Sequence, residues 1–202
     1  AGSDTIDGGY GNDTLSGGTG DDTFLISDGY DLIDGGAGND RYVFNAAYAN
    51  NALVIYGAEE WITGGRDYIY TESDFETASL FDLKVKDLSG DGALDTITFD
   101  FREDTSIPGW EWFHLDFSTR RTDLPIQVGF FDDAMRHPFE LDGRPGMDIS
   151  GNGRGSNTLT GSFQINELDI DTSGATAKVN SLSVSFTQHS DNDPDALTGL
   201  FN

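Results

Sequence analysis

The chain has 202 residues with 36 acidic and 11 basic side chains, a net charge of −25, and no cysteine. The absence of cysteine excludes disulfides, thiolate metal sites and cysteine nucleophiles. The acidic excess favours cation binding and disfavours nucleic-acid phosphates and anionic membranes, so we expect no nucleic-acid partner. No apolar run is long enough for a membrane span.

The first 44 residues repeat with a period of nine. The copies read GGYGNDTLS from Gly8, GGTGDDTFL from Gly17, ISDGYDLID from Ile26 and GGAGNDRYV from Gly35, and AGSDTID at the start fits the same frame. The sixth position is always aspartate and the eighth is apolar or aromatic: Asp4 with Ile6, Asp13 with Leu15, Asp22 with Phe24, Asp31 with Ile33, and Asp40 with Tyr42. This recurrence favours an ordered repeat over the alternative, a flexible Gly/Asp linker.

The chemistry of each copy suits calcium. Glycines permit a tight loop with exposed carbonyl groups, aspartate adds a carboxylate, and Ca²⁺ takes six to eight oxygen ligands. The nonapeptide resembles the RTX (repeats-in-toxin) parallel β-roll, in which two repeats form one turn and calcium lies between loops 18 residues apart. Ile26 and Ser27 replace the glycine pair of the fourth copy, so that loop is the weakest candidate. The resemblance implies these ligands: Asp4, Gly8, Tyr10, Asp13, Gly17, Thr19, Asp22, Asp31, Gly35, Ala37 and Asp40.

Calcium dependence also predicts where the protein works. Extracellular calcium modules bind at roughly 10⁻⁴–10⁻³ M, far above the calcium concentration of a bacterial cytosol. The RTX resemblance therefore implies a secreted bacterial protein that folds outside the cell, usually after type I export. The chain begins inside a repeat and shows no signal peptide, so we expect it to be part of a longer protein.

The repeat ends after Phe44, which predicts a roll over 1–44 and a second domain over 45–202. Leu53–Tyr56 is an apolar run expected to cap the open end of the roll. Residues 57–78 are weakly patterned. Their aromatic side chains either line a ligand surface or belong to an ordinary loop and strand; they include Trp61, Tyr68 and Tyr70.

From residue 79 onward, apolar residues alternate with polar ones between Gly, Asp, Asn and Pro turns. This pattern predicts an antiparallel β-sandwich or jelly-roll-like domain, so the whole chain is expected to be all-β. The residues expected to face the core are Phe81, Leu83 and Val85; Ile97, Phe99 and Phe101; Phe113, Leu115 and Phe117; Ile126, Val128 and Phe130; Phe163 and Ile165; Leu168 and Ile170; and Leu182, Val184 and Phe186.

A second calcium candidate, DLSGDGALD, lies between the first two of these strands at 87–95. It resembles the calcium loops of β-hairpins in integrin-type propellers and the first half of an EF-hand loop. Gly92 allows the sharp turn, and no terminal glutamate follows. The alternative is a polar turn with solvated acids. The expected ligands are Asp87, Ser89, Asp91, the carbonyl of Ala93, and Asp95.

The second half of the chain, Trp110–Asn202, is similar to a little-characterised secreted bacterial β-domain. The matching stretches are LPIQVGFFDDAMRHPF, PGMDISGNGRGSNTLTGSFQINEL and LSVSFTQHSDNDPDALTGLFN. The matching positions are Ala134, Arg136, Pro138, Phe139, Arg154, Asn157, Glu167, Gln188 and His189. Where the family often has cysteines, this chain has Ser156 and Ser190, and their joint replacement implies a disulfide in relatives.

No catalytic motif occurs among residues that include three histidines, His114, His137 and His189. His114 lies on the polar face of a strand and is expected to be exposed, and His189 is expected to be structural rather than catalytic, so we expect binding rather than catalysis. The first hypothesis is a monomeric, calcium-dependent module that binds a polysaccharide or cell-surface glycan. Trp110 and Trp112, next to the Pro108-Gly109 turn, would stack on sugars, unless they serve core packing. The alternatives are a folding and secretion domain of a larger toxin or hydrolase, and an unrecognised hydrolase.

Overall fold

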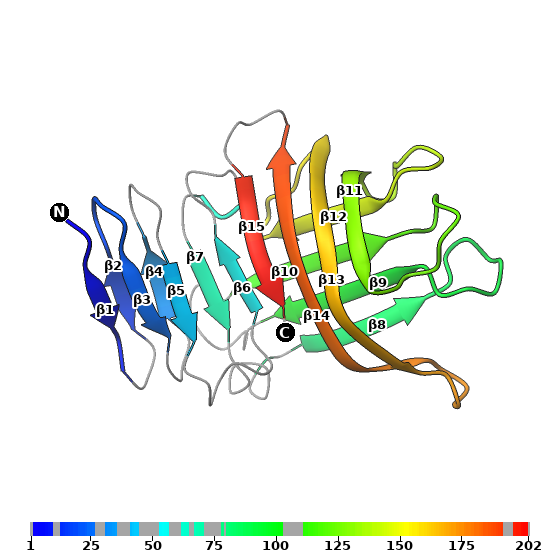
Figure 1. Cartoon of the computed structure of the whole chain (residues 1–202), viewed down its shortest axis with the longest axis horizontal. Coiled ribbons are helices and arrows are strands. Elements are labelled where there is room, and N and C mark those ends of the chain that lie inside the picture. Colours follow the sequence, from blue (N-terminus) through cyan, green and yellow to red (C-terminus); the bar gives the residue numbers. More distant parts are fainter. Residues whose placement is uncertain are drawn as a thin grey trace.

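A computed structural model describes residues 2–9, 13–26, 31–35, 41–44, 53–56, 62–64, 67–70, 78, 80–102, 111–191 and 196–201. All regular elements in these ranges are β-strands, which confirms the all-β prediction. The strands form a three-stranded sheet, β1-β3-β5, and a twelve-stranded sheet, β2-β4-β7-β6-β15-β14-β13-β11-β12-β10-β9-β8 (Figure 1). The described residues contain no helix that could cross a membrane.

The strands are short in the N-terminal part and longest near the C-terminus. Their bounds are β1 (Thr5–Asp7), β2 (Thr14–Ser16), β3 (Thr23–Ile26), β4 (Asp31–Asp34), β5 (Arg41–Phe44), β6 (Leu53–Tyr56), β7 (Asp67–Tyr70), β8 (Leu80–Lys86), β9 (Thr96–Arg102), β10 (Trp112–Ser118), β11 (Gly129–Arg136), β12 (Gly146–Gly151), β13 (Leu159–Asp171), β14 (Lys178–Ser190) and β15 (Ala196–Phe201).

The N-terminal strands form a parallel roll with the predicted turn of 18 residues. Thr5 pairs with Thr23 between β1 and β3, and Thr14 pairs with Leu32 between β2 and β4. The eighth positions of the repeats point into one apolar cluster, in which Phe24 and Ile33 are fully buried and Ile6 and Leu15 partly buried. The side chain of Tyr42 lies outside the described residues.

The roll and the sandwich share one continuous sheet. Strand β7 pairs antiparallel with β4 of the roll, and β6 lies between β7 and β15 of the sandwich. The strand that covers the roll edge is therefore β7. The predicted cap, Leu53–Tyr56, lies one strand further along and contacts the roll core through Val54.

Strands β6 and β7 serve two cores at once. Val54 and Ile69 pack into the roll cluster, whereas Leu53 and Tyr70 pack into the sandwich core from the opposite face. Strands buried on both faces read as continuous apolar runs rather than as alternation, which explains the weak pattern of this stretch. Tyr68 is also a core residue, only 3% exposed, so the idea that Tyr68 and Tyr70 line a ligand surface is wrong.

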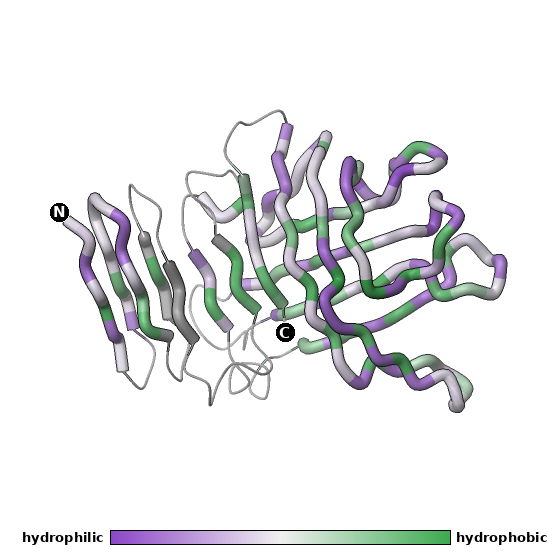
Figure 2. The backbone as a smooth tube through the Cα atoms, in the orientation of Figure 1, coloured by the Kyte–Doolittle hydropathy of each residue, from purple (hydrophilic) through white to green (hydrophobic). Residues whose placement is uncertain are grey.

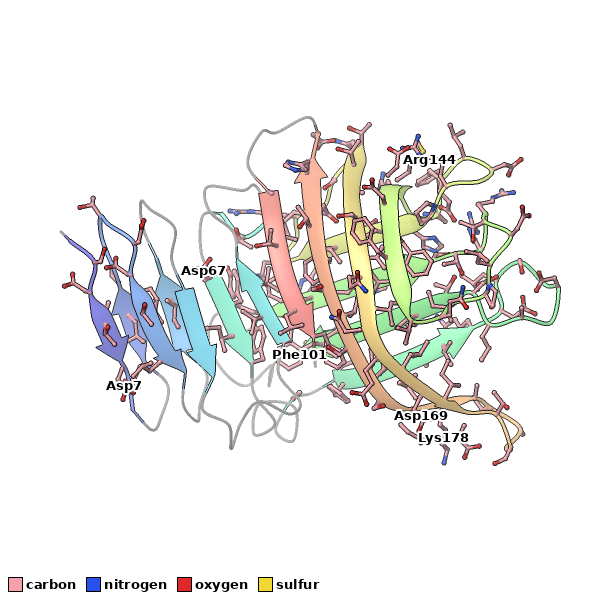
Figure 3. All side chains as sticks on the ribbon, in the orientation of Figure 1. Asp7, Asp67, Phe101, Arg144, Asp169 and Lys178 are labelled. Atoms are coloured by element: carbon pink, nitrogen blue, oxygen red, sulfur yellow. The ribbon has the colours of Figure 1, made fainter. Side chains whose placement is uncertain are left out.

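The sandwich forms because the large sheet folds over on itself. Strands β8, β9, β10 and β12 pack against β13, β14 and β15 (Figure 1). Ring contacts cross the interior: the Phe117 centroid lies 5.2 Å from that of Phe163 and 5.8 Å from that of Phe186, and Phe99 lies 4.7 Å from Phe201. Figure 2 shows hydrophobic and hydrophilic residues alternating along the sandwich strands, as the sequence predicts.

Three residues predicted to be in the core are instead exposed. Phe81, on the edge strand β8, is 44% exposed, and Val128 and Phe130 are 56% and 62% exposed. Ahead of the bulge, Phe131 pairs with the buried Phe163 and Phe130 pairs with Gln164, so Phe131 faces the core and Phe130 faces solvent; the β-bulge between Phe131 and Ala134 then lets Ala134 face the core as well. A one-residue shift exchanges the two faces of a strand, and simple alternation cannot anticipate it.

The alternation in the sequence did not predict β12, a six-residue strand that begins and ends with glycine, or β15, whose pattern is interrupted by Gly199. Gly199 on β15 shows why glycine is needed there. A Cβ at this position would lie 2.5 Å from the Val54 carbonyl oxygen and closer still to the Phe186 ring. Gly199 thus allows β15 to approach β6, which links the sandwich to the roll.

Candidate functional site

The best-described candidate calcium position of the roll surrounds Asp22. Its side chain is 1% exposed, and its Oδ1 accepts a hydrogen bond of 2.7 Å from the backbone N–H of Asp4, one turn earlier. A Cβ on Gly17 would clash with Asp22 Oδ2 and would lie 2.6 Å from the Gly35 carbonyl oxygen. A buried carboxylate and a carbonyl oxygen therefore meet at a residue that must be glycine, and these hard oxygen donors fit Ca²⁺.

The other predicted roll ligands are placed to different extents. The carbonyl of Thr19 accepts a 2.8 Å hydrogen bond from Gly2 N–H, and a Cβ on Gly8 would lie 2.9 Å from Asp13 Oδ2. The first contact joins successive turns of the roll, and the second lies within the single loop that connects β1 to β2. Tyr10, Ala37, Asp40 and the side chain of Asp31 lie outside the described residues.

The predicted hairpin loop at 87–95 connects β8 to β9 at the end of the sandwich remote from the roll (Figure 1). Asp87 accepts backbone hydrogen bonds from Gly90 (2.6 Å) and Gly92 (2.8 Å), which lower the pKa of its carboxyl group. Asp95, 3% exposed, accepts the N–H groups of Leu88 and Ser89. The acids thus hold the loop in shape.

Among the described residues, the acids of this loop do not converge to form a complete metal site. Asp91 accepts one hydrogen bond, 2.8 Å from Ala93 N–H, so most of its acceptor capacity remains available, since a carboxylate offers about four lone-pair sites. Within the described ranges, no group of three or more His, Asp or Glu side chains converges on one ion position. Calcium binding at 87–95 therefore stays a prediction.

A cavity of about 260 Å³ opens beside this loop. One wall comes from the hairpin and the other from residues 119–125, which follow β10. Backbone hydrogen bonds join the walls, from Thr119 N–H to the Asp95 carbonyl (2.7 Å) and from Ile126 N–H to the Leu94 carbonyl (2.9 Å). The lining residues are Ser89, Asp91, Ala93, Asp95, Thr119, Arg120, Thr122, Asp123, Leu124 and Pro125.

Arg120 is the cationic group of this cavity, and sequence reasoning missed it. Its Nε donates to Glu140 Oε1 and its Nη2 donates to the Pro138 carbonyl oxygen at 2.5 Å. His137 Nδ1 lies 3.3 Å from the same Glu140 oxygen. Burial opposes ionisation of Glu140, but His137 and Arg120 outweigh it and lower the Glu140 pKa to about 2. No local pattern links residues 20 positions apart, so only loop packing reveals this cluster.

Trp112 lies at the other end of β10 from this cavity. It pairs with Arg102, whereas Ser118 pairs with Thr96 beside the hairpin loop, so about 20 Å separates the two ends at 3.4 Å per residue. Trp112 is half-buried. Trp110 lies outside the described residues. The structure therefore separates the predicted stacking residue Trp112 from the predicted calcium hairpin.

His114 is part of an ionic network on the outer face of the sandwich. Its Nδ1 lies 2.6 Å from Asp100 Oδ1, and its Nε2 lies 2.8 Å from Asp116 Oδ2. Thr98 donates a further 2.8 Å hydrogen bond to Asp116. The hydrogen bonds with Asp116 and Asp100 outweigh partial burial and raise the pKa of His114 to about 9. The imidazole is therefore protonated at neutral pH, which suits a structural ion pair better than a metal ligand or a general base.

We expect the His114 network to make stability fall between about pH 6.5 and pH 9. The folded pKa of about 9 lies above the unfolded value of 6.5, so the stabilisation is fully present below pH 6.5 and is lost as the pH rises through 9. Urea unfolding at several pH values should show this slope. His114→Gln should flatten it, and an equal slope in that variant would contradict the assignment.

Ser156 and Ser190 lie together, as their resemblance-based pairing implies. The Ser156 hydroxyl donates to Ser190 Oγ at 2.7 Å, and both residues are 2% exposed. Gln188 braces the pair, since its Nε2 lies 3.4 Å from each serine oxygen while its amide bonds the backbone of Ile149 at 2.9 and 3.0 Å. His189, which directly follows Gln188 on β14, is half-buried.

Comparison with known proteins identifies the N-terminal segment. Residues 1–25 and 27–46 match the RTX calcium-binding nonapeptide repeat in four copies, which confirms the resemblance. The break in the match falls at Ile26, where the fourth copy departs from the repeat. No curated protein and no solved structure matches the chain significantly.

Proposed function

We propose that this chain is the calcium-folded extracellular module of a secreted RTX protein, and that it binds a polysaccharide or cell-surface glycan without catalysis. RTX calcium-binding repeats form the roll, and RTX proteins are typically secreted by bacteria. Beyond calcium binding, the proposed role is that of a monomeric sandwich that holds a glycan at its loop end.

The observation that carries the proposal is the cavity beside the 87–95 loop. β-sandwiches present their loops at the two ends of the sheets, where binding sites are commonly built. The cavity combines hydroxyl groups, carboxylates, one guanidinium and an apolar wall, which is the mixture that a sugar ring can contact. Calcium bound in the loop would add a Lewis-acidic position at the rim for sugar hydroxyl groups.

A glycan and polysaccharide screen tests this function. The protein is applied in millimolar calcium and again in chelator, and circular dichroism establishes that it is folded in calcium. We expect retention of at least one glycan class in calcium and its loss in chelator. No retention of any glycan by the folded protein would defeat the proposal.

Two variants then locate the binding end. Asp87→Ala removes the carboxylate that shapes the hairpin loop and should abolish retention while calcium still folds the distant roll. Trp112→Ala, at the opposite end of β10, should leave retention unchanged. Loss of retention in Trp112→Ala alone would move the site to that end and make Trp112 a stacking residue.

A second candidate is the folding and secretion role. It is favoured by the continuous sheet, in which β4 of the roll pairs with β7 and β7 with β6 of the sandwich. Calcium that orders the roll would then present a ready edge on which the sandwich strands assemble. A folded protein that retains no glycan would favour this role.

A further inference from the structure

The cavity beside the hairpin loop carries an inference about ligand chemistry that rests on the proposed function. We infer that it holds one neutral sugar ring, and that it disfavours uronic or sulfated sugars. Its volume of about 260 Å³ lies below the roughly 300–1,000 Å³ of pockets for drug-sized ligands, so a single ring suits it.

The charges around the cavity oppose an anionic ligand. Three carboxylates line it, those of Asp91, Asp95 and Asp123, against the single guanidinium of Arg120. The charge of Arg120 is already matched by Glu140, whose side chain is completely buried behind it. With one Ca²⁺ in the loop, the three lining carboxylates, Arg120 and Glu140 together still carry a net charge of −1, so a carboxylate or sulfate on the ligand would be repelled.

Neutral hydroxyl groups meet no such repulsion. Asp91 and Asp123 are both exposed, and their carboxylates can accept hydrogen bonds from sugar hydroxyls. Hydrogen bonds to a charged acceptor are stronger than bonds between neutral groups. Leu124, 51% exposed, and Pro125 provide an apolar surface for the C–H face of a ring.

Arg120 is held in place to act as the hydrogen-bond donor of the cavity. Glu140 and the Pro138 carbonyl bind its Nε and Nη2, and within the described residues no protein group accepts from its Nη1. Glu140 is itself fully buried and packs closely against Gly146, where an added Cβ would lie 3.0 Å from Glu140 Cδ. A guanidinium fixed in this way loses little entropy when it donates to a ligand oxygen, so Glu140 is a positioning residue.

Matched oligosaccharides test the inference on the full chain in millimolar calcium. Calorimetry compares a neutral oligosaccharide of the retained class with its uronic-acid counterpart. We expect the uronic form to bind at least tenfold more weakly at low salt, and the difference to shrink in 0.5 M salt, because screening weakens charge repulsion. Equal or tighter binding of the uronic form would overturn the inference while leaving the proposed glycan function intact.

Variants tie this selectivity to the cavity. Asp123→Asn keeps the side-chain shape but removes one charge. It should reduce the ratio of neutral-sugar affinity to uronic-sugar affinity severalfold. Arg120→Lys, which loses the planar fork, should weaken neutral-sugar binding about tenfold. Asp142 is an exposed acid that pairs with Arg121 outside the cavity, so Asp142→Asn is the control. It should change neither the affinity ratio nor the affinity for the neutral sugar.

The outcomes separate the two claims. Unchanged binding in both cavity variants, with melting temperatures near that of the parent, would remove the cavity as the site. Failure of every sugar to bind the folded protein would instead defeat the proposed function, and the inference with it. A shift in selectivity in Asp123→Asn but not in Asp142→Asn supports the inference.

Discussion

Asp22→Ala should raise the calcium concentration at the midpoint of roll folding by about tenfold or more. The variant removes a carboxylate that is 1% exposed and that lies where the Gly17 and Gly35 loops meet. It also removes the acceptor of the Asp4 N–H, so the loops lose both an expected calcium ligand and their mutual hydrogen bond. A tenfold change corresponds to about 1.4 kcal/mol. Circular dichroism during a calcium titration measures it.

Two further variants separate charge from shape. Asp22→Asn can still accept the Asp4 N–H but lacks the charge, so a loss close to that of Asp22→Ala would assign the effect to calcium ligation. Asp132→Asn, an exposed acid on β11, should leave the titration unchanged. A parental midpoint in Asp22→Ala would show that the repeat register assigned to this loop is wrong.

The double variant Ser156→Cys with Ser190→Cys should form a disulfide and stabilise the sandwich by about 3 kcal/mol. The hydroxyl oxygens are 2.7 Å apart in a buried site, and the residues are 34 positions apart along the chain. Closing a loop of this length removes unfolded-state entropy worth about 3–4 kcal/mol, from which any native strain subtracts. For a chain of this size, the melting temperature should rise by about 6–12 °C.

Mass spectrometry and a thiol assay establish whether the bond forms. The same variant in reductant and the single variant Ser156→Cys are the controls, and neither should gain stability. Two free thiols after oxidation would show that these positions cannot take the pairing implied by the resemblance to that β-domain. Formation without a gain in melting temperature would instead point to native strain.

In the repeat region, the sequence alone is sufficient to predict the strand register. The nine-residue period, the aspartate at position six and the apolar residue at position eight determine the register, since each copy repeats the same local contacts. Phe24 and Ile33 lie in the roll core as that register requires. The alternating strands were equally readable, because burial on one face of a sheet imposes a period of two.

Other features depend on the tertiary structure alone. The register of β11, which places Phe131 inward and Phe130 outward, is a choice between two faces that the local sequence leaves open. Strand β7 was hidden because both of its faces are buried, against the roll and against the sandwich. In both cases the competing forces come from neighbours distant in sequence.

The candidate site also has some features that the sequence predicts and others that only the tertiary structure reveals. The sequence by itself determined the acids that can attract calcium, in the roll and at 87–95, because loop ligands follow one another along the chain. Only the tertiary structure decided that Arg120, Glu140 and Asp123 stand beside the hairpin loop and that Trp112 stands at the opposite end of β10. Cavities are formed by loops that meet after the sheet has folded over, and their lining leaves no periodic trace in the sequence.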